Sequence, residues 1–149
     1  MHLVRRFFGF ITAKPLKPTE QQDVRDQLPP ALAAAFFAQR MEDQRHALDV
    51  KRRTYSRACT EAALLHDIGK TESDLGAVSR SFATVWDAVG LPTFGRWRSY
   101  LDHNSSGAKM LEELGAGELA IAFALHHPGP VPEGVDPVHW HALEDADNV

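Results

Sequence analysis

Residues 62–70 read Ala-Ala-Leu-Leu-His-Asp-Ile-Gly-Lys, an apolar helical stretch that runs directly into the pair His66–Asp67. A histidine nitrogen and a carboxylate oxygen are both metal ligands, but neighbouring side chains on a regular helix diverge by about 100°. Both can therefore face one metal ion only near a helix end. Gly69 is placed to allow such an end, because glycine adopts backbone angles that other residues avoid. The stretch thus predicts a helix that stops at a pair of potential metal ligands.

The 149 residues have an ordinary globular composition, with 44% hydrophobic and 24% charged residues. This length is enough for one domain with its own hydrophobic core. The formal net charge of −4 provides no basic field, so no nucleic-acid polymer is expected as a partner. Cys59 is the only cysteine, which excludes an internal disulfide and suits a reducing cytoplasm. We expect it to be a small buried side chain rather than a catalytic thiol.

The sequence gives no indication of a membrane-spanning segment. No apolar run approaches the roughly eighteen residues that a membrane helix needs. The segment Arg5–Ile11 is basic and aromatic, but the apolar stretch ends by Lys14 and is shorter than a usual secretory core. We therefore expect a cytoplasmic protein.

Helical spacing of apolar residues and helix-capping residues recur along most of the chain. No segment shows the sustained alternation typical of strands. The predicted fold is all-α, a single bundle of about six to eight short helices. These are expected after the capping residue Thr19 and over residues 31–39, 41–55, 60–65, 75–89, 105–114, 119–127 and 137 to the C-terminus. Residues 1–39 are expected to form an N-terminal helical extension, and residues 40–149 a metal-binding domain.

Further potential ligands recur at the ends and on the faces of these predicted helices. They are His46, His103, His126, His127 and Asp147. Glu42 lies four residues before His46 and shares its helix face. Asp147 falls on the inward face of the last helix, because Trp140, Leu143 and Asp147 follow the i, i+3, i+7 spacing of an apolar stripe.

Four or five imidazoles with two or three carboxylates are more ligands than one ion uses. Two ions about 3.5–4 Å apart need such a set together with a bridging carboxylate, and Asp67 is the natural bridge. Mixed imidazole and carboxylate ligation favours Fe, Mn, Zn, Co or Ni over Ca or Mg. A water molecule between two such cations would lose a proton near neutral pH and become a nucleophile.

The order His46, then His66–Asp67 within His-Asp-Ile-Gly-Lys, then Asp147 resembles the HD-domain superfamily of metal-dependent phosphohydrolases. The additional histidines are similar to those of its binuclear branch, which includes the HD-GYP phosphodiesterases. The resemblance covers about residues 40–149. The loop 128–134 lacks the Gly-Tyr-Pro element of the HD-GYP proteins, which argues against cyclic di-GMP as the substrate.

The resemblance implies two sets of metal ligands. One ion would be held by His46, His66, Asp67 and Asp147, and the second by Asp67, His103, His126 and His127. As an alternative, His127 could simply donate a hydrogen bond to a metal ligand. Glu42 corresponds to an extra ligand in some of these proteins, with an ordinary salt bridge to Arg40 or Arg45 as the alternative. Lys70 matches the family lysine near the substrate phosphate.

The expected function is hydrolysis of a phosphate ester in a nucleotide or another small phosphorylated metabolite. Asp67 would carry the bridging hydroxide with its metal ions, and Lys70 would balance the developing negative charge. Arg96 and Arg98, beside Trp97, could add contacts to a phosphate and a base. Two alternatives stay open: a diiron oxygenase resembling myo-inositol oxygenase, and a nucleotide-sensing module that binds without turnover.

Overall fold

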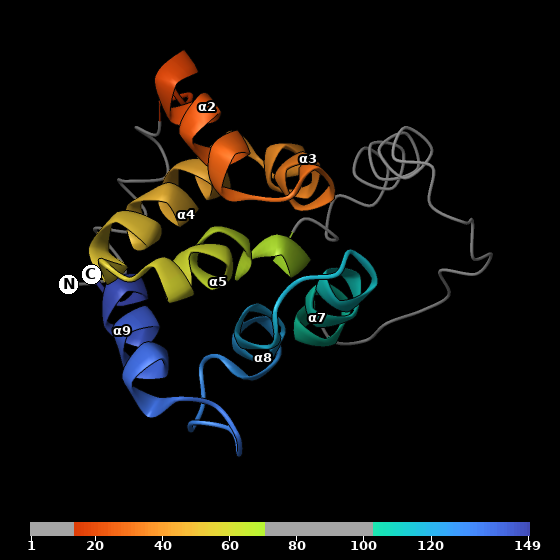
Figure 1. Ribbon diagram of the computed structural model, residues 1–149, viewed down its shortest axis with the longest axis vertical. Coiled ribbons are helices and arrows are strands. Elements are labelled where there is room, and N and C mark those ends of the chain that lie inside the picture. The colour runs from red at the N-terminus through yellow and green to blue at the C-terminus, as the bar shows by residue number, and fades with distance from the viewer. Residues whose placement is uncertain (1–13, 71–102) are drawn as a thin grey trace.

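The computed structural model describes residues 14–70 and 103–149, and these two ranges are predominantly helical (Figure 1). The helices are α2 (Pro18–Gln27), α3 (Pro30–Ala38), α4 (Met41–Thr54), α5 (Thr60–Leu65), α7 (His103–Glu113), α8 (Glu118–His126) and α9 (Pro137–Asp147), with the 3₁₀ helix η1 (Arg57–Cys59) before α5. Neither range contains a strand, which confirms the all-α prediction. The helix predicted over residues 75–89 lies outside the described residues. Within the two ranges, no helix combines the length and apolar character needed to cross a bilayer.

Helix α5 lies at the centre of this arrangement (Figure 1). It packs against α4 on one side and α8 on the other. Helix α9 packs against α4, and α7 packs against α8. The C-terminal end of α5, which carries the His66–Asp67 pair, is therefore surrounded by helices from both halves of the chain.

Two hydrophobic clusters hold these helices together. In the first, Leu32 and Phe36 of α3 pack with Leu64 of α5, all fully buried. The second cluster contains Phe123 and Trp140, from α8 and α9. The segment predicted as an N-terminal extension thus shares a core with α5, and its division from the metal-binding domain stays a prediction.

Cys59 belongs to the second cluster and has no exposed surface, as the sequence predicts. Its Sγ lies 3.7 Å from the carbonyl oxygen of His139. Burial raises the pKa of this thiol, which keeps it protonated at neutral pH. The side chain therefore acts as a small core residue.

The helix ends show which capping signals decide the boundaries. Helix α9 begins as predicted, with the Asp136 carboxylate accepting the Val138 N–H at 2.8 Å. The prediction that Thr19 caps α2 is wrong, because the helix starts earlier, at Pro18. Proline fits the first helical position because its missing N–H needs no partner there. Glu20 then stands where its carboxylate accepts the backbone N–H of Lys17 at 2.8 Å.

Glu20 also fastens α2 to α4 through two arginines. Its two carboxylate oxygens accept bonds from Arg45 Nη1 and Nη2, both at 2.9 Å, in a bidentate pair. Arg52 Nη2 donates a third bond, at 2.8 Å. Arg45 leads the contacts that hold the pKa of Glu20 well below its usual range. Arg45 also donates to the backbone oxygens of Lys14 and Pro15, so it ties down the start of the described chain.

Replacing Glu20 with glutamine is expected to lower the free energy of unfolding by about 1 kcal/mol, because charge-assisted bonds to two arginines become weaker or are lost. Urea unfolding at pH 7 measures the change. Glu113→Gln, at an exposed position on α7, is the control and should leave stability unchanged. Equal stability of Glu20→Gln and the parent would show that this ion-pair network contributes nothing.

Candidate metal centre

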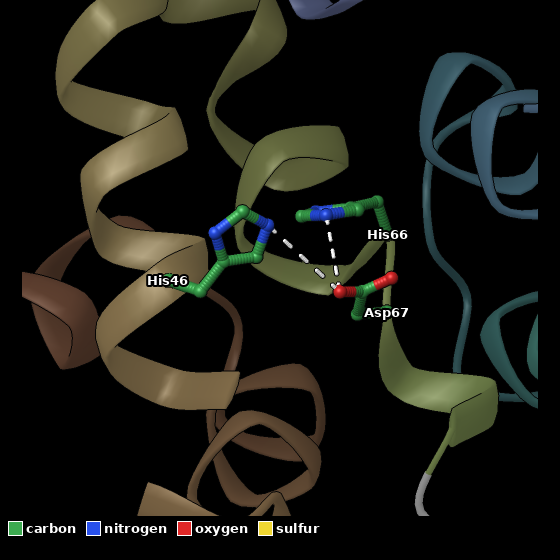
Figure 2. A group of neighbouring side chains, drawn as sticks. All are labelled: His46, His66 and Asp67. Atoms are coloured by element: carbon green, nitrogen blue, oxygen red, sulfur yellow. Dashed lines mark ion pairs between the residues drawn. The ribbon is translucent and has the colours of Figure 1, made fainter. Parts of the chain in front are cut away.

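The His66–Asp67 pair stands where α5 stops being regular. Helix α5 ends at Leu65, residues 66–67 form a turn, and residues 68–70 form a 3₁₀ turn. The N–H of Lys70 closes this turn by donating to the carbonyl oxygen of Asp67 at 2.9 Å. The expected helix end is confirmed, and the two adjacent side chains face one point instead of diverging (Figure 2).

Three of the predicted ligand residues come together at that point. His46 reaches it from α4, and its Nε2 lies 4.0 Å from Asp67 Oδ2 (Figure 2). The Nε2 of His66 lies 3.4 Å from the same oxygen. The ligand atoms of His46, His66 and Asp67 all lie within 4.8 Å of one another, so this cluster could hold a metal ion.

Asp147 approaches the same imidazoles from α9. Its Oδ1 accepts a bond from His46 Nε2 at 2.8 Å and lies 3.5 Å from His66 Nε2. The carboxylate is buried, as are Trp140 and Leu143, which confirms the predicted inward face. Arg53 donates to the carbonyl oxygen of Ala146 at 3.2 Å, and this bond holds the last turn of α9 against α4.

The hydrogen bonding of His66 leaves its Nε2 directed at these carboxylates. Its Nδ1 donates to the carbonyl oxygen of Ala63 at 2.8 Å, so the neutral ring carries its proton on Nδ1. Nε2 is buried on the side of the ring that faces the cluster. The nearest carboxylate oxygens, of Asp67 and Asp147, lie 3.4 and 3.5 Å away. A buried imidazole nitrogen and two carboxylates that converge in this way offer a metal cation three ligands.

The charges around the cluster shift three pKa values. Burial opposes the ionisation of Asp147, but hydrogen bonds from His127 and His46 hold its pKa well below the usual range. Burial likewise opposes ionisation of Asp67, and the charges of His66 and Lys70 lower its pKa overall. For His66, burial disfavours the imidazolium, yet Asp147 and Asp67 outweigh it and raise the pKa. Both carboxylates are therefore anionic at neutral pH and available to a cation.

A pocket of about 260 Å³ opens beside the cluster. Its lining includes His66, Asp67, Gly69, Lys70, Gly107, Phe123, Ala124, His127, Pro128, Asp147 and Asn148. Phe123 and Ala124 give it an apolar wall, whereas the cluster and Lys70 give it a polar one. Lys70 is largely exposed, and its Nζ lies 2.6 Å from Asp67 Oδ2. A small molecule in this pocket would touch both the candidate metal ligands and a cationic side chain.

Of the histidines predicted to bind a second ion, His127 lies at the pocket and His126 does not. His127 lines the pocket, and its Nε2 lies 3.0 Å from Asp147 Oδ2. His126, next to it in the chain, is exposed at the end of α8 and is not part of the pocket lining. The backbone of His103 begins α7, but its side chain lies outside the described residues, as do Arg96 and Arg98.

Glu42 lies 4.0 Å from Arg40, which matches the salt bridge considered as its alternative role. Its neighbour Asp43, which was not predicted as a site residue, is buried on α4. Burial and the negative charge of Asp67 raise the pKa of Asp43. Its position three residues before His46 was the available signal, because residues three apart share a helix face.

Comparisons with protein-family models, curated proteins and solved structures gave no significant match to this chain. The choice of a function therefore depends on the geometry of these side chains and on the resemblance of the sequence motif.

Proposed function

We propose that the chain binds a divalent transition metal ion through His46, His66, Asp67 and Asp147 and hydrolyses a phosphate ester beside it. The observation that carries the metal site is the convergence of the ligand atoms of His46, His66 and Asp67, which all lie within 4.8 Å of one another. The buried His66 Nε2 also faces the carboxylate oxygens of Asp67 and Asp147 at 3.4 and 3.5 Å. Two imidazoles with two carboxylates suit Fe, Mn, Zn, Co or Ni.

The phosphate ester is supported by the resemblance to the HD-domain phosphohydrolases and by the pocket next to the cluster. Lys70 stands at this pocket with its side chain largely exposed and its Nζ paired with Asp67 Oδ2 at 2.6 Å. From this position its ammonium group could also contact a phosphoryl oxygen and balance the charge that develops there. A bound ion would supply Lewis acidity and lower the pKa of a coordinated water. The modest pocket, with its short apolar wall, favours a small phosphorylated metabolite or nucleotide.

We favour one ion over two. The second ion of the implied set would need His103, His126 and His127 beside Asp67. Of the two with described side chains, His126 is exposed and His127 is bonded to Asp147 on the first site. The two-ion arrangement stays a prediction, and metal stoichiometry distinguishes it from the one-ion arrangement.

The decisive measurement is elemental analysis of protein that has been loaded with Zn²⁺, Mn²⁺ or Fe²⁺ and then freed of excess metal. We expect one equivalent per chain in the parent and in His126→Ala, and none in His66→Ala. Circular dichroism checks that each variant is folded. A folded parent that retains no metal would contradict the proposal, and two equivalents would support the binuclear set instead.

Activity is tested with nucleoside monophosphates, p-nitrophenyl phosphate and bis(p-nitrophenyl) phosphate. We expect hydrolysis of at least one of them by the Zn²⁺- or Mn²⁺-loaded parent, and a loss of more than about a hundredfold in His66→Ala. His126→Ala should retain the parent rate. Turnover that requires iron and dioxygen would favour the oxygenase alternative, and binding without hydrolysis would favour the sensing module.

A further inference from the structure

We infer that His127 is a positioning residue, which holds the Asp147 carboxylate from the side that faces away from the ion. This inference rests on the metal site proposed above. It replaces the role of second-metal ligand that the sequence resemblance implies for His127.

The two carboxylate oxygens of Asp147 have different partners. Oδ1 faces the cluster, at 2.8 Å from His46 Nε2 and 3.5 Å from His66 Nε2. Oδ2 accepts a bond from His127 Nε2 at 3.0 Å. An ion among His46, His66 and Asp67 would therefore meet Oδ1, while His127 occupies the other oxygen.

The ring of His127 is fixed by aromatic packing. It stacks on Phe123, with ring centroids 4.3 Å apart and ring planes inclined by 12°. Phe123 is fully buried and meets Trp140 edge to face at 5.0 Å. The backbone N–H of His127 also donates to the carbonyl oxygen of Phe123 at 3.0 Å. The hydrogen-bond donor is thus set in place by the second hydrophobic cluster before any ion arrives.

The chemistry of this contact differs from that of a ligand. To donate to Oδ2, His127 Nε2 must carry a proton, so its lone pair is not available there. His46 Nε2 makes a similar bond to Oδ1, but it points into the cluster, where an ion would replace its proton. A hydrogen bond on the far oxygen fixes the orientation of a ligating carboxylate, and losing such a contact typically lowers metal affinity by about 10- to 100-fold.

The first test is Zn²⁺ affinity, measured by competition with a chromophoric chelator at pH 7.5. His127→Ala should still bind one equivalent, but about 10- to 100-fold more weakly than the parent. His127→Gln, whose amide can still donate a hydrogen bond, should recover part of that loss. His126→Ala is the matched control and should bind like the parent, because the His126 side chain is exposed and does not line the pocket.

The second test follows the imidazole nitrogens by ¹⁵N NMR as Zn²⁺ is added. We expect the Nε2 proton of His46 to be lost and that of His127 to be retained. Loss of the His127 proton, or a fall from two equivalents to one in His127→Ala, would identify a ligand and overturn the inference. Parent-like affinity of His127→Ala would overturn it as well. A parent that binds no Zn²⁺ would instead refute the proposed metal site itself, and the inference with it.

Discussion

Asp147→Asn is expected to weaken metal binding by more than about a hundredfold, because it removes the anionic oxygen that lies between two imidazoles. The amide has nearly the same shape as the carboxylate, so the change acts through charge and hydrogen bonding rather than packing. It also places an uncharged group beside His46 and His127, which both bond to the carboxylate in the parent. Chelator competition measures the affinity.

The same variant should lose stability in the metal-free protein, with a defined dependence on pH. The lowered pKa of folded Asp147 gives stability that is present above its unfolded pKa of about 3.9 and lost as the pH falls. The raised pKa of folded His66 gives stability that is complete below about pH 6.5 and lost as the pH rises through its folded value. The ion pair of Asp147 and His66 therefore contributes most to the free energy of unfolding from about pH 4 to about pH 6.5.

Urea unfolding in the presence of a chelator, at several pH values, measures this profile. We expect Asp147→Asn to lower the free energy of unfolding by about 3 kcal/mol near pH 6, and by less at pH 9. Asp145→Asn is the matched control, since Asp145 is exposed on the same helix. A loss for Asp147→Asn that is the same at every pH would show that the charges of the pair are not its cause.

The candidate ligands whose positions in the fold the sequence predicted correctly follow local patterns. Asp147 could be assigned to the buried face because Trp140 and Leu143 mark that face at helical spacing, and the structure buries all three. The His66–Asp67 pair could be placed at a helix end because adjacent residues converge only there. Such inferences need no knowledge of how distant helices pack.

The distinction between His126 and His127 could not be made in this way. The helix ends at His126, and His127 already has the extended backbone angles φ −83° and ψ 135°. The two side chains therefore leave α8 in different directions, and a sequence pattern does not locate a helix end to within one residue. The stacking of His127 on Phe123 places His127, and not His126, at the pocket. This stacking depends on tertiary packing, which the sequence pattern does not reveal. The burial of Asp43 differs from this case, because its position three residues before His46 was a local signal.

The contact between α7 and the turn after Asp67 is another tertiary feature, and it determines the effect of Gly107→Ala. Alanine within a helix is intrinsically favoured over glycine by about 1 kcal/mol, so helix propensity alone predicts stabilisation. A Cβ at position 107, however, would lie 2.9 Å from the backbone nitrogen of Gly69 and 3.1 Å from its Cα. Backbone atoms cannot rotate away as a side chain can. We therefore expect the opposite sign, a loss of about 2 kcal/mol and a Tm lower by roughly 5 °C.

The displaced backbone is the turn that carries Asp67 and Lys70, so Gly107→Ala should also weaken Zn²⁺ binding, although no ligand is changed. Thermal unfolding and chelator competition measure the two effects. Gly117→Ala is the control: its Cβ would meet only the flexible carboxylate of Glu61, at 3.3 Å, and stability should change by less than about 1 kcal/mol. If Gly107→Ala proved more stable than the parent, α7 could not lie this close to the turn. The coupling of that contact to the metal ligands would then be refuted.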